Sequence, residues 1–180
     1  MSQVRFVSRF LKWVFIVGVV FLPVVQAVFW AYADHEFFWQ NAATVLPYDV
    51  SLPALAVSAS KTKLLCFLIS MIPTGISMAI FLFLIRLFSL YAKGVVFESA
   101  NILLIRNIAY LLLVGAAIGP VYEALITIAY SMSNPAGQRM VCLSTQTINL
   151  TGIVTGLMIL VVAWIMAEGH ALQQEQELTV

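Results

Sequence analysis

Residues 64–85, LLCFLISMIPTGISMAIFLFLI, decide the fold because they contain no charged side chain over 22 consecutive positions. A helix needs about 20 apolar residues to cross the roughly 30 Å hydrocarbon layer of a membrane. Strands of a transmembrane barrel would alternate apolar and polar residues over about 10 positions, and this stretch does not alternate. It therefore predicts a membrane-spanning α-helix.

Three further stretches have the same character. Residues 13–33 and 148–167 carry no charge, and residues 107–131 carry one acid. Allowing for their flanks, we expect four helices, followed by a tail. The helices are expected over about 10–33, 64–88, 104–131 and 148–168, and the tail over 169–180. The predicted fold class is all-α, an integral membrane four-helix bundle.

The composition excludes several classes of protein. Hydrophobic residues make up 62% of the 180 residues and charged residues 9%, with a net charge of +1. Soluble domains carry about 25% charged residues, and a chain of this size cannot bury so much apolar surface in its own core. A soluble enzyme, a disordered tail and a basic nucleic-acid binder are therefore excluded, and the expected partner is a lipid bilayer.

Basic side chains predict the orientation, because they gather on the cytoplasmic side of membrane proteins. The N-terminal segment and the connection between the second and third helices carry Arg5, Arg9, Lys12, Arg86, Lys93 and Arg106, and the opposite side carries Lys61, Lys63 and Arg139. Both termini are therefore expected in the cytoplasm, although Lys61 and Lys63 oppose the rule. Ala31-Tyr32-Ala33 resembles a signal-peptide cleavage site, but the apolar region before it is longer than a signal peptide usually has, so we expect an uncleaved helix.

The first outer loop, residues 34–63, is expected to contain a short interfacial segment. Aromatic residues favour the level of the lipid headgroups, and they cluster near the start of this loop at Trp30, Tyr32, Phe37, Phe38 and Trp39. Asp34, His35 and Glu36 resemble metal ligands, with Asp49 as a fourth. Consecutive residues do not converge easily on one ion, and His170 lies on the other side. We therefore expect no metal and no cofactor.

Glu123 is the most informative single residue, because an ionisable group within a membrane helix is costly and suggests a functional site. Polar residues expected at a similar depth are Gln26, Ser70, Thr74, Thr127 and Asn149. One interpretation is a polar cavity that holds a proton, an ion or a small ligand. The other is a set of interhelical hydrogen bonds that fix packing, worth about 0.6 kcal/mol each. Packing is favoured because a single acid makes a poor proton relay.

Small residues predict where helices pack closely. Gly115 and Gly119 are four residues apart, as are Gly152 and Gly156, and such pairs allow a neighbouring helix to approach. Pro120 is expected to kink the third helix. The two cysteines, Cys66 and Cys142, both fall near the outer face, where they either form a disulfide or remain two free thiols.

The segment KGVVFESAN (93–101), followed by LIR (104–106), and the ending EGHALQQEQELTV (168–180) resemble the YoaS-like group of small bacterial integral-membrane proteins, catalogued as a domain of unknown function. Within these segments the residues singled out are Gly94, Phe97, Asn101, Arg106, Glu175 and Leu178. Gly94 is expected to end the second helix, and Ser99 or Asn101 to cap the third. Relatives are often encoded beside a small helix-turn-helix regulator. The resemblance implies a bacterial inner membrane and a regulatory setting, but no activity.

Three functions follow from these observations. The favoured one is a non-enzymatic membrane protein that acts as a sensor or regulator through contacts with a second copy or another membrane protein. The alternative is a small transporter or channel subunit with a polar cavity around Glu123. An intramembrane enzyme is the least favoured, because the sequence supports no pairing of a nucleophile with a base.

Overall fold

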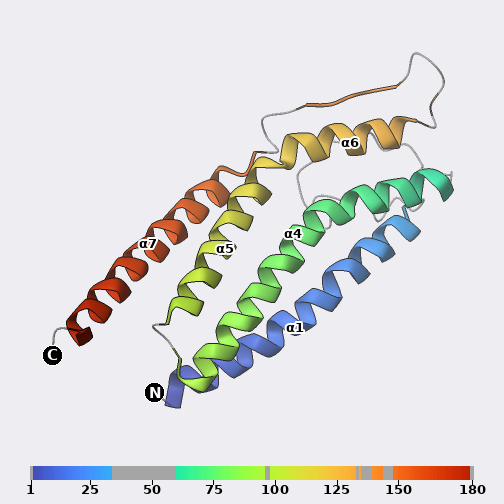
Figure 1. The fold of residues 1–180 in the computed structure, drawn as a ribbon. Coiled ribbons are helices and arrows are strands. Elements are labelled where there is room, and N and C mark those ends of the chain that lie inside the picture. The colour runs from blue at the N-terminus through green and yellow to red at the C-terminus, as the bar shows by residue number, and fades with distance from the viewer. Residues whose placement is uncertain are drawn as a thin grey trace. The chain divides into compact units, whose positions relative to one another are not determined.

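The structure, a computed structural model, describes residues 2–33, 60–95, 98–132, 134, 139–143 and 148–178. Within these residues the regular elements are five α-helices, with no β-strand (Figure 1). They are α1 (Ser2–Ala31), α4 (Ser60–Lys93), α5 (Ser99–Ala117), α6 (Gly119–Ser131) and α7 (Leu150–Leu178). The all-α prediction is confirmed, whereas most of the expected interfacial segment in 34–63 lies outside the described residues.

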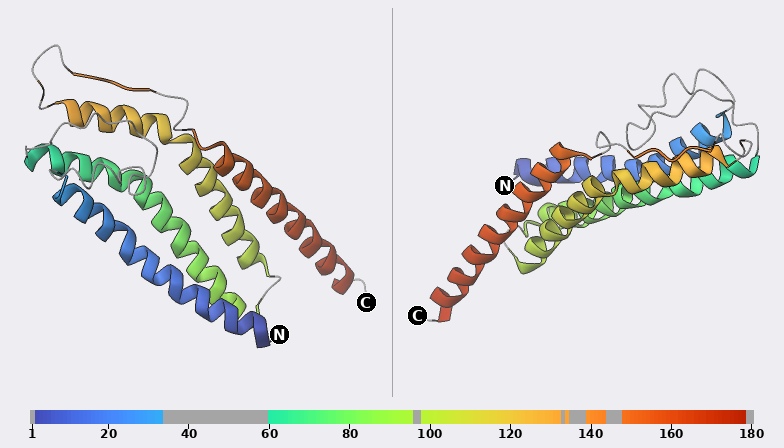
Figure 2. Two further views of the ribbon diagram at one scale, coloured as in Figure 1. Left: turned by 180° about the vertical axis from the view of Figure 1, so that it is seen from behind. Right: turned by 90° about the horizontal axis from the view of Figure 1, so that it is seen from above.

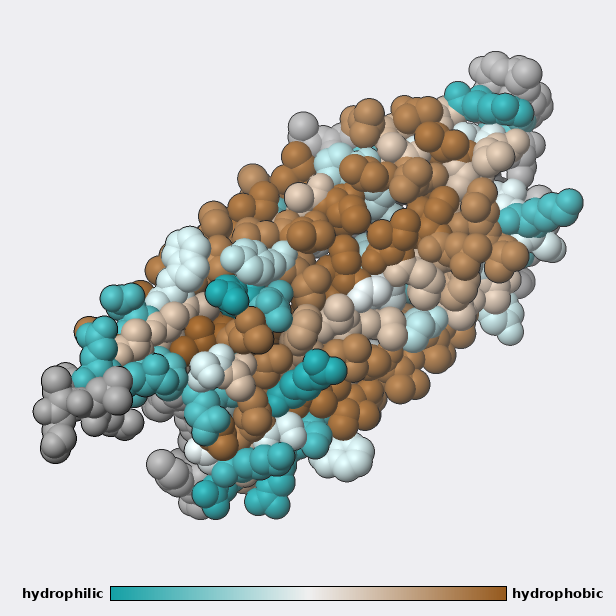
Figure 3. Space-filling view, viewed as in Figure 1, coloured by the Kyte–Doolittle hydropathy of each residue, from teal (hydrophilic) through white to brown (hydrophobic). Residues whose placement is uncertain are grey.

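Four of the helices are long and apolar enough to cross a membrane. These spans are Arg5–Ala31, Ser60–Lys93, Ser99–Ala117 and Leu150–Glu175. Only 17% to 28% of the residues in their most apolar windows are buried inside the protein, and hydrophobic residues cover most of the face seen in Figure 3. Soluble proteins rarely expose so large an apolar surface. The prediction of a multi-pass membrane protein with four spans is therefore confirmed.

The helices extend beyond the limits expected from the uncharged stretches. α1 begins at Ser2 instead of near residue 10, and α4 covers Ser60–Lys93 instead of 64–88. α7 continues to Leu178, so that the expected tail 169–180 is largely the end of the last helix. An absence of charge marks the part of a helix that lipid can surround. It does not mark the helix ends, because Glu, Gln, Lys and Arg are themselves good helix formers.

The single helix expected over 104–131 is instead two helices, α5 and α6, with a break at Ile118. Pro120 lies in the first turn of α6, where the missing N–H of proline is tolerated. Within a continuous helix its ring would clash with the preceding turn. The N–H of Tyr122 donates to the carbonyl oxygen of Ile118 at 2.9 Å and closes the first turn of α6. Glu123 consequently lies on a 13-residue helix that is not one of the four candidate spans.

The chain divides into two compact units, each of which contains parts of several helices. The first unit comprises residues 1–19, 78–114 and 150–180, which include the beginning of α1, the end of α4, most of α5 and all of α7. The second unit comprises residues 20–77 and 115–149, which include the end of α1, the beginning of α4 and all of α6.

In the first unit, the start of α1, the end of α4 and the start of α5 lie at one end, and α7 runs towards the same end (Figures 1 and 2). Phe15 of α1 contacts two rings of α4, with centroids 5.3 Å from that of Phe81 and 5.7 Å from that of Phe88. Gly18 allows this approach, since a Cβ atom there would come within 2.6 Å of the Phe81 ring. The aromatic contacts therefore hold α1 against α4, and the absence of a side chain at Gly18 makes room for them.

The end of α4 is closed by Gly94, which has a φ of +88°. Its N–H donates to the carbonyl oxygen of Tyr91 at 3.0 Å, and the N–H of Val95 donates to that of Leu90 at 3.1 Å. This pair of bonds is a Schellman motif, which satisfies carbonyl groups that a helix end otherwise leaves without partners. Glycine adopts this left-handed conformation without the steric cost of a Cβ atom.

Asn101 does not cap the start of the third helix, although the sequence suggested it as one of two caps. α5 begins at Ser99, so that Asn101 lies within its first turn, and the N–H of Asn101 donates to the carbonyl oxygen of Glu98 at 2.9 Å. The fully buried side chain of Asn101 donates from Nδ2 to the carbonyl oxygen of Val95 at 3.0 Å. Asn101 therefore fastens the end of the α4 segment to α5, while Phe97 lies outside the described residues.

In the second unit, the buried core consists of apolar residues from α1 and the turn after it, from α4 and from α6. Its members are Phe29, Trp30, Ala33, Cys66, Tyr122, Ile126, Ala129 and Tyr130, with Phe67 and Ile69 packed against them. Phe29 and Trp30 meet edge to face, with ring centroids 5.3 Å apart. The aromatic residues expected at the headgroup level thus include one, Trp30, that is almost completely buried.

The four packing glycines occupy different environments. A Cβ atom at Gly156 of α7 would come within 2.9 Å of Leu113 Cγ and Cδ2 and 3.3 Å of the carbonyl oxygen of Ala109, so α7 approaches the backbone of α5 closely. At Gly115 it would meet only Ile76 Cγ2, at 3.4 Å. Gly119 is buried and Gly152 half-buried. Gly156 is therefore the glycine among these whose missing side chain allows the tightest described contact.

We expect Gly156→Ala to lower the free energy of unfolding by about 1–3 kcal/mol, because the added methyl group overpacks a contact that includes backbone. Gly75→Ala is the matched control, since a Cβ atom there meets nothing within 4 Å, and the substitution should be neutral or stabilise the helix by up to about 1 kcal/mol. Denaturant unfolding of the purified protein in detergent measures both. Equal stability of the two variants would contradict the close α5–α7 contact.

Candidate functional site

A chain of hydrogen bonds links three helices of the second unit through one serine hydroxyl. The indole Nε1–H of Trp30 on α1 donates to Ser70 Oγ on α4 at 3.0 Å. The same oxygen lies 3.1 Å from Tyr122 Oη on α6. All three side chains are at most 1% exposed. A hydroxyl offers one donor and two acceptor positions, so Ser70 can satisfy both aromatic partners, and we call these residues the Trp30–Ser70–Tyr122 triad.

Two other hydroxyls on α4 bond to their own helix. Thr74 Oγ1 donates to the carbonyl oxygen of Ser70 at 2.7 Å, and Ser77 Oγ donates to that of Pro73 at 3.2 Å. Pro73 lies inside α4 and cannot donate a backbone hydrogen bond. Such bonds to the preceding turn satisfy a hydroxyl in an apolar setting and often accompany a bent helix. Thr74, although predicted in the polar site, therefore stabilises the backbone beside Ser70.

On α6, hydroxyls hold the segment that follows the helix. Thr127 Oγ1 accepts a bond from the N–H of Cys142 at 3.1 Å and lies 2.8 Å from its acceptor, the carbonyl oxygen of Glu123. Ser131 Oγ accepts from the N–H of Met140 at 3.2 Å. Residues 139–143 are thereby fastened along α6. The predicted site residue Thr127 thus has a structural role.

The other predicted polar residues differ in how deeply they are buried. Glu123 and Gln26 are buried, at 2% and 4% exposed, and belong to the second unit. Asn149 is exposed, and its backbone N–H donates to the carbonyl oxygen of Ala116 at 3.4 Å. Asn149 therefore lies at the start of α7 and is exposed, whereas Glu123 and Gln26 are buried; a shared polar site of these residues stays a prediction.

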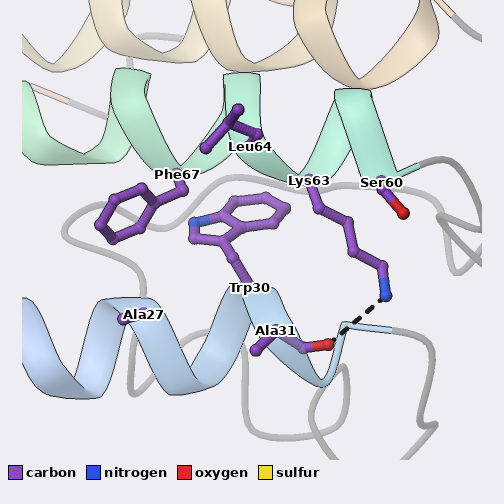
Figure 4. Close-up of a pocket in the computed structure, with 7 residues that line it drawn as sticks. All are labelled: Ala27, Trp30, Ala31, Ser60, Lys63, Leu64 and Phe67. Atoms are coloured by element: carbon purple, nitrogen blue, oxygen red, sulfur yellow. Dashed lines mark hydrogen bonds between the residues drawn. The ribbon is translucent and has the colours of Figure 1, made fainter.

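An open cavity of about 260 Å³ lies beside Trp30, between the end of α1 and the beginning of α4 (Figure 4). It is lined by Ala27, Trp30, Ala31, Ser60, Lys63, Leu64 and Phe67. The Lys63 ammonium donates to the carbonyl oxygen of Ala31 at 3.4 Å. This oxygen belongs to the last residue of α1, where the helix dipole favours a positive charge. Lys63 therefore caps a helix that has no basic residue in its own last turn.

Trp30, Tyr122 and Lys63 were not predicted as site residues. A buried indole or phenol needs a hydrogen-bond partner, and this requirement could have indicated Trp30 and Tyr122. The aromatic cluster instead suggested that Trp30 lies at the level of the lipid headgroups. Lys63 was considered only as a basic residue on the outer side, where it opposes the positive-inside rule. Which hydroxyl meets which ring depends on the rotation of three helices, and apolar periodicity alone does not give it.

The two cysteines are free thiols, Cys66 buried and Cys142 half-buried. Of the two alternatives, the structure therefore has the free thiols. Cys66 belongs to the apolar core cluster, whereas the backbone of Cys142 is fastened to Thr127. Among the described residues no three His, Cys, Asp or Glu side chains group as a metal site, and Asp34, His35, Glu36 and Asp49 lie outside these residues.

The described residues of the family-like segments belong to the first unit, whereas the triad belongs to the second. Gly94 and Asn101 shape the connection between α4 and α5. Arg106 is exposed on α5, and Glu175 is exposed on α7. Leu178 is the last residue of α7.

Comparison with known proteins gives one finding. The family model described as "Protein of unknown function (DUF2975)" matches residues 13–180. No curated protein and no solved structure matches the chain. The matched range includes α1 from residue 13 onwards, all of α4, α5, α6 and α7, and both segments that carry the resemblance.

Ser70→Ala should destabilise the protein by about 1–3 kcal/mol, because it removes the buried hydroxyl that accepts from Trp30 Nε1–H and shares a hydrogen bond with Tyr122 Oη. Ser77→Ala is the control, since its hydroxyl bonds only to the turn before it, and we expect it to change stability by less than about 0.6 kcal/mol. Thermal unfolding in detergent, followed by tryptophan fluorescence, compares the two. The triad would lose its assigned role if both variants unfolded alike.

Proposed function

We propose that the chain, which belongs to the family described as "Protein of unknown function (DUF2975)", is a non-enzymatic membrane protein that acts through contacts, as a sensor or regulator. The family assignment agrees with the resemblance to a family of unknown function. The YoaS-like group is a narrower identity and remains a prediction, as does the bacterial inner membrane.

The observation that carries this proposal is how the buried hydroxyls are used. Ser70 joins three helices, Thr74 bonds to its own helix, and Thr127 holds the segment after α6. A transport path instead requires polar groups that face water or a substrate. Side chains whose hydrogen bonds are made within the protein support packing, and a rigid membrane unit suits a protein that signals through contacts.

The end of α7 is the surface that we assign to a partner. α7 has 29 residues, which is about 43 Å of helix against about 30 Å of hydrocarbon. Its ending therefore extends past the apolar layer, with exposed Leu172 and Glu175. A regulatory setting, implied by the resemblance, fits a helix that presents such an end to a partner protein or to a second copy of the chain.

A photo-reactive amino acid placed at Leu172 should form a discrete adduct in intact bacterial membranes, because this exposed residue lies on the extending end of α7. Two differently tagged copies distinguish a second copy of the chain from another protein, which mass spectrometry then identifies. The control position is Met158, which is also exposed but lies only about 12 Å along α7 from Leu150, against about 33 Å for Leu172 and about 30 Å of hydrocarbon, and we expect it to label lipid. No adduct from Leu172, or the same adduct from both positions, would contradict the proposal.

One observation favours the alternative of a transporter or channel subunit. Glu123 is ionisable and almost completely buried in the same unit as Gln26. If these residues lined a water-filled path, reconstituted protein would conduct protons or ions, and Glu123→Gln would abolish the flux. On the proposal above, we expect no flux above empty liposomes, with Glu123→Gln and the unmodified chain behaving alike in a fluorescent-dye assay.

A further inference from the structure

The first unit contains a groove between the beginning of α5 and the end of α7. It consists of two cavities, of about 420 and 180 Å³, which share Ile102 and His170 as lining residues. The remaining lining residues of the larger cavity are Ser99, Ala100, Leu103, Arg106 and Ala167, and those of the smaller one are Met166, Gly169 and Gln173. We call this hollow the α5–α7 groove.

The polar part of the groove favours an anion. The side chain of Arg106 is exposed and has no hydrogen bond or ion pair with any of the described residues. Ser99 and Ala100 are the first residues of α5, where backbone N–H groups and the helix dipole present positive charge. His170 Nε2 lies 3.3 Å from Gln174 Nε2, so its ring is held at the groove. None of the described lining residues is acidic, and the neighbouring Glu98 and Glu168 are exposed outside the lining.

The groove also lies at the level expected of lipid headgroups. α5 has 19 residues, about 28 Å of helix, which matches the hydrocarbon thickness and puts Ser99 at its boundary. Arg106 is about 10 Å further along, and its long side chain can extend most of the way towards the boundary, since helix side chains tilt towards the helix N-terminus. On α7, His170 is about 30 Å from Leu150, so it reaches the boundary of the same layer.

We propose that the α5–α7 groove binds an anionic phospholipid, with the headgroup phosphate on Arg106 and the first turn of α5. One acyl chain then lies along the apolar wall made by Ile102, Leu103 and Ala167. Arginine is well suited to a phosphate because its planar guanidinium donates two parallel bonds. The apolar wall continuous with the cation favours a lipid over soluble phosphate. Basic hollows between membrane helices are a known kind of lipid site, and this inference does not depend on the proposed function.

Native mass spectrometry of the full chain tests the inference, with phosphatidylglycerol and phosphatidylcholine of identical acyl chains as probes. We expect the unmodified protein to retain phosphatidylglycerol preferentially. Arg106→Gln should weaken this binding at least about fivefold, the effect of one basic residue near an anionic lipid surface. The matched control is Arg86→Gln, because Arg86 is also exposed but does not line the groove, and it should bind as the unmodified chain does.

A second variant keeps the charge and fills the space. Ala167→Trp introduces an indole at a lining position that is exposed, and it should reduce phosphatidylglycerol binding while the thermal unfolding temperature without lipid stays unchanged. Inorganic phosphate should not displace the lipid. The inference is overturned if Arg106→Gln binds normally, if Arg86→Gln loses as much binding, or if inorganic phosphate competes fully, since the last result would identify a simple anion site.

Discussion

Lipid offers no hydrogen bonds, and this constraint governs the rest of the structure. Every backbone N–H and carbonyl group inside a membrane needs a partner within the protein, so all described regular elements are helices. A helix satisfies these groups along its length but leaves four of them at each end without intrahelical partners. The Schellman bonds at Gly94 satisfy carbonyl groups at the end of α4, and the Lys63 ammonium donates to the last carbonyl oxygen of α1. The helix ends therefore explain residues that the apolar pattern leaves unexplained.

The same constraint applies to side chains, and it accounts for the triad. A polar group buried in an apolar core is costly unless it is bonded, and Trp30 and Tyr122 each bring one such group into the second unit. The Ser70 hydroxyl is small enough to lie between the two rings and can serve both. Three helices are therefore oriented by one oxygen atom, which gives them a specific rotation that apolar contacts alone would leave loosely defined.

The fold was predictable because lipid imposes a long, uncharged stretch on every span, and such stretches are visible without any structure. The break between α5 and α6 was predicted only in part. Pro120 indicated a kink, but whether a proline bends a helix or starts a new one depends on the packing around it. The site was less predictable still. Ser70 and Glu123 stand out as polar residues in apolar surroundings, yet the partners of Ser70 are aromatic residues whose polar atoms are easily overlooked. Asn149, another polar residue at the expected depth, is exposed, because depth along a helix does not determine burial.

Lys63 also bears on the orientation of the chain. The positive-inside rule counts basic residues as if each were free to lie on either side, and Lys61 and Lys63 weaken the prediction that both termini are cytoplasmic. Lys63, however, donates to the last carbonyl of α1, so its position satisfies a helix end. A basic residue with that local role is weaker evidence about orientation than an exposed one such as Arg86 or Arg106. Once Lys63 is discounted, the remaining basic residues favour cytoplasmic termini more strongly than the simple count does, and the connection between α4 and α5 is expected on that same side.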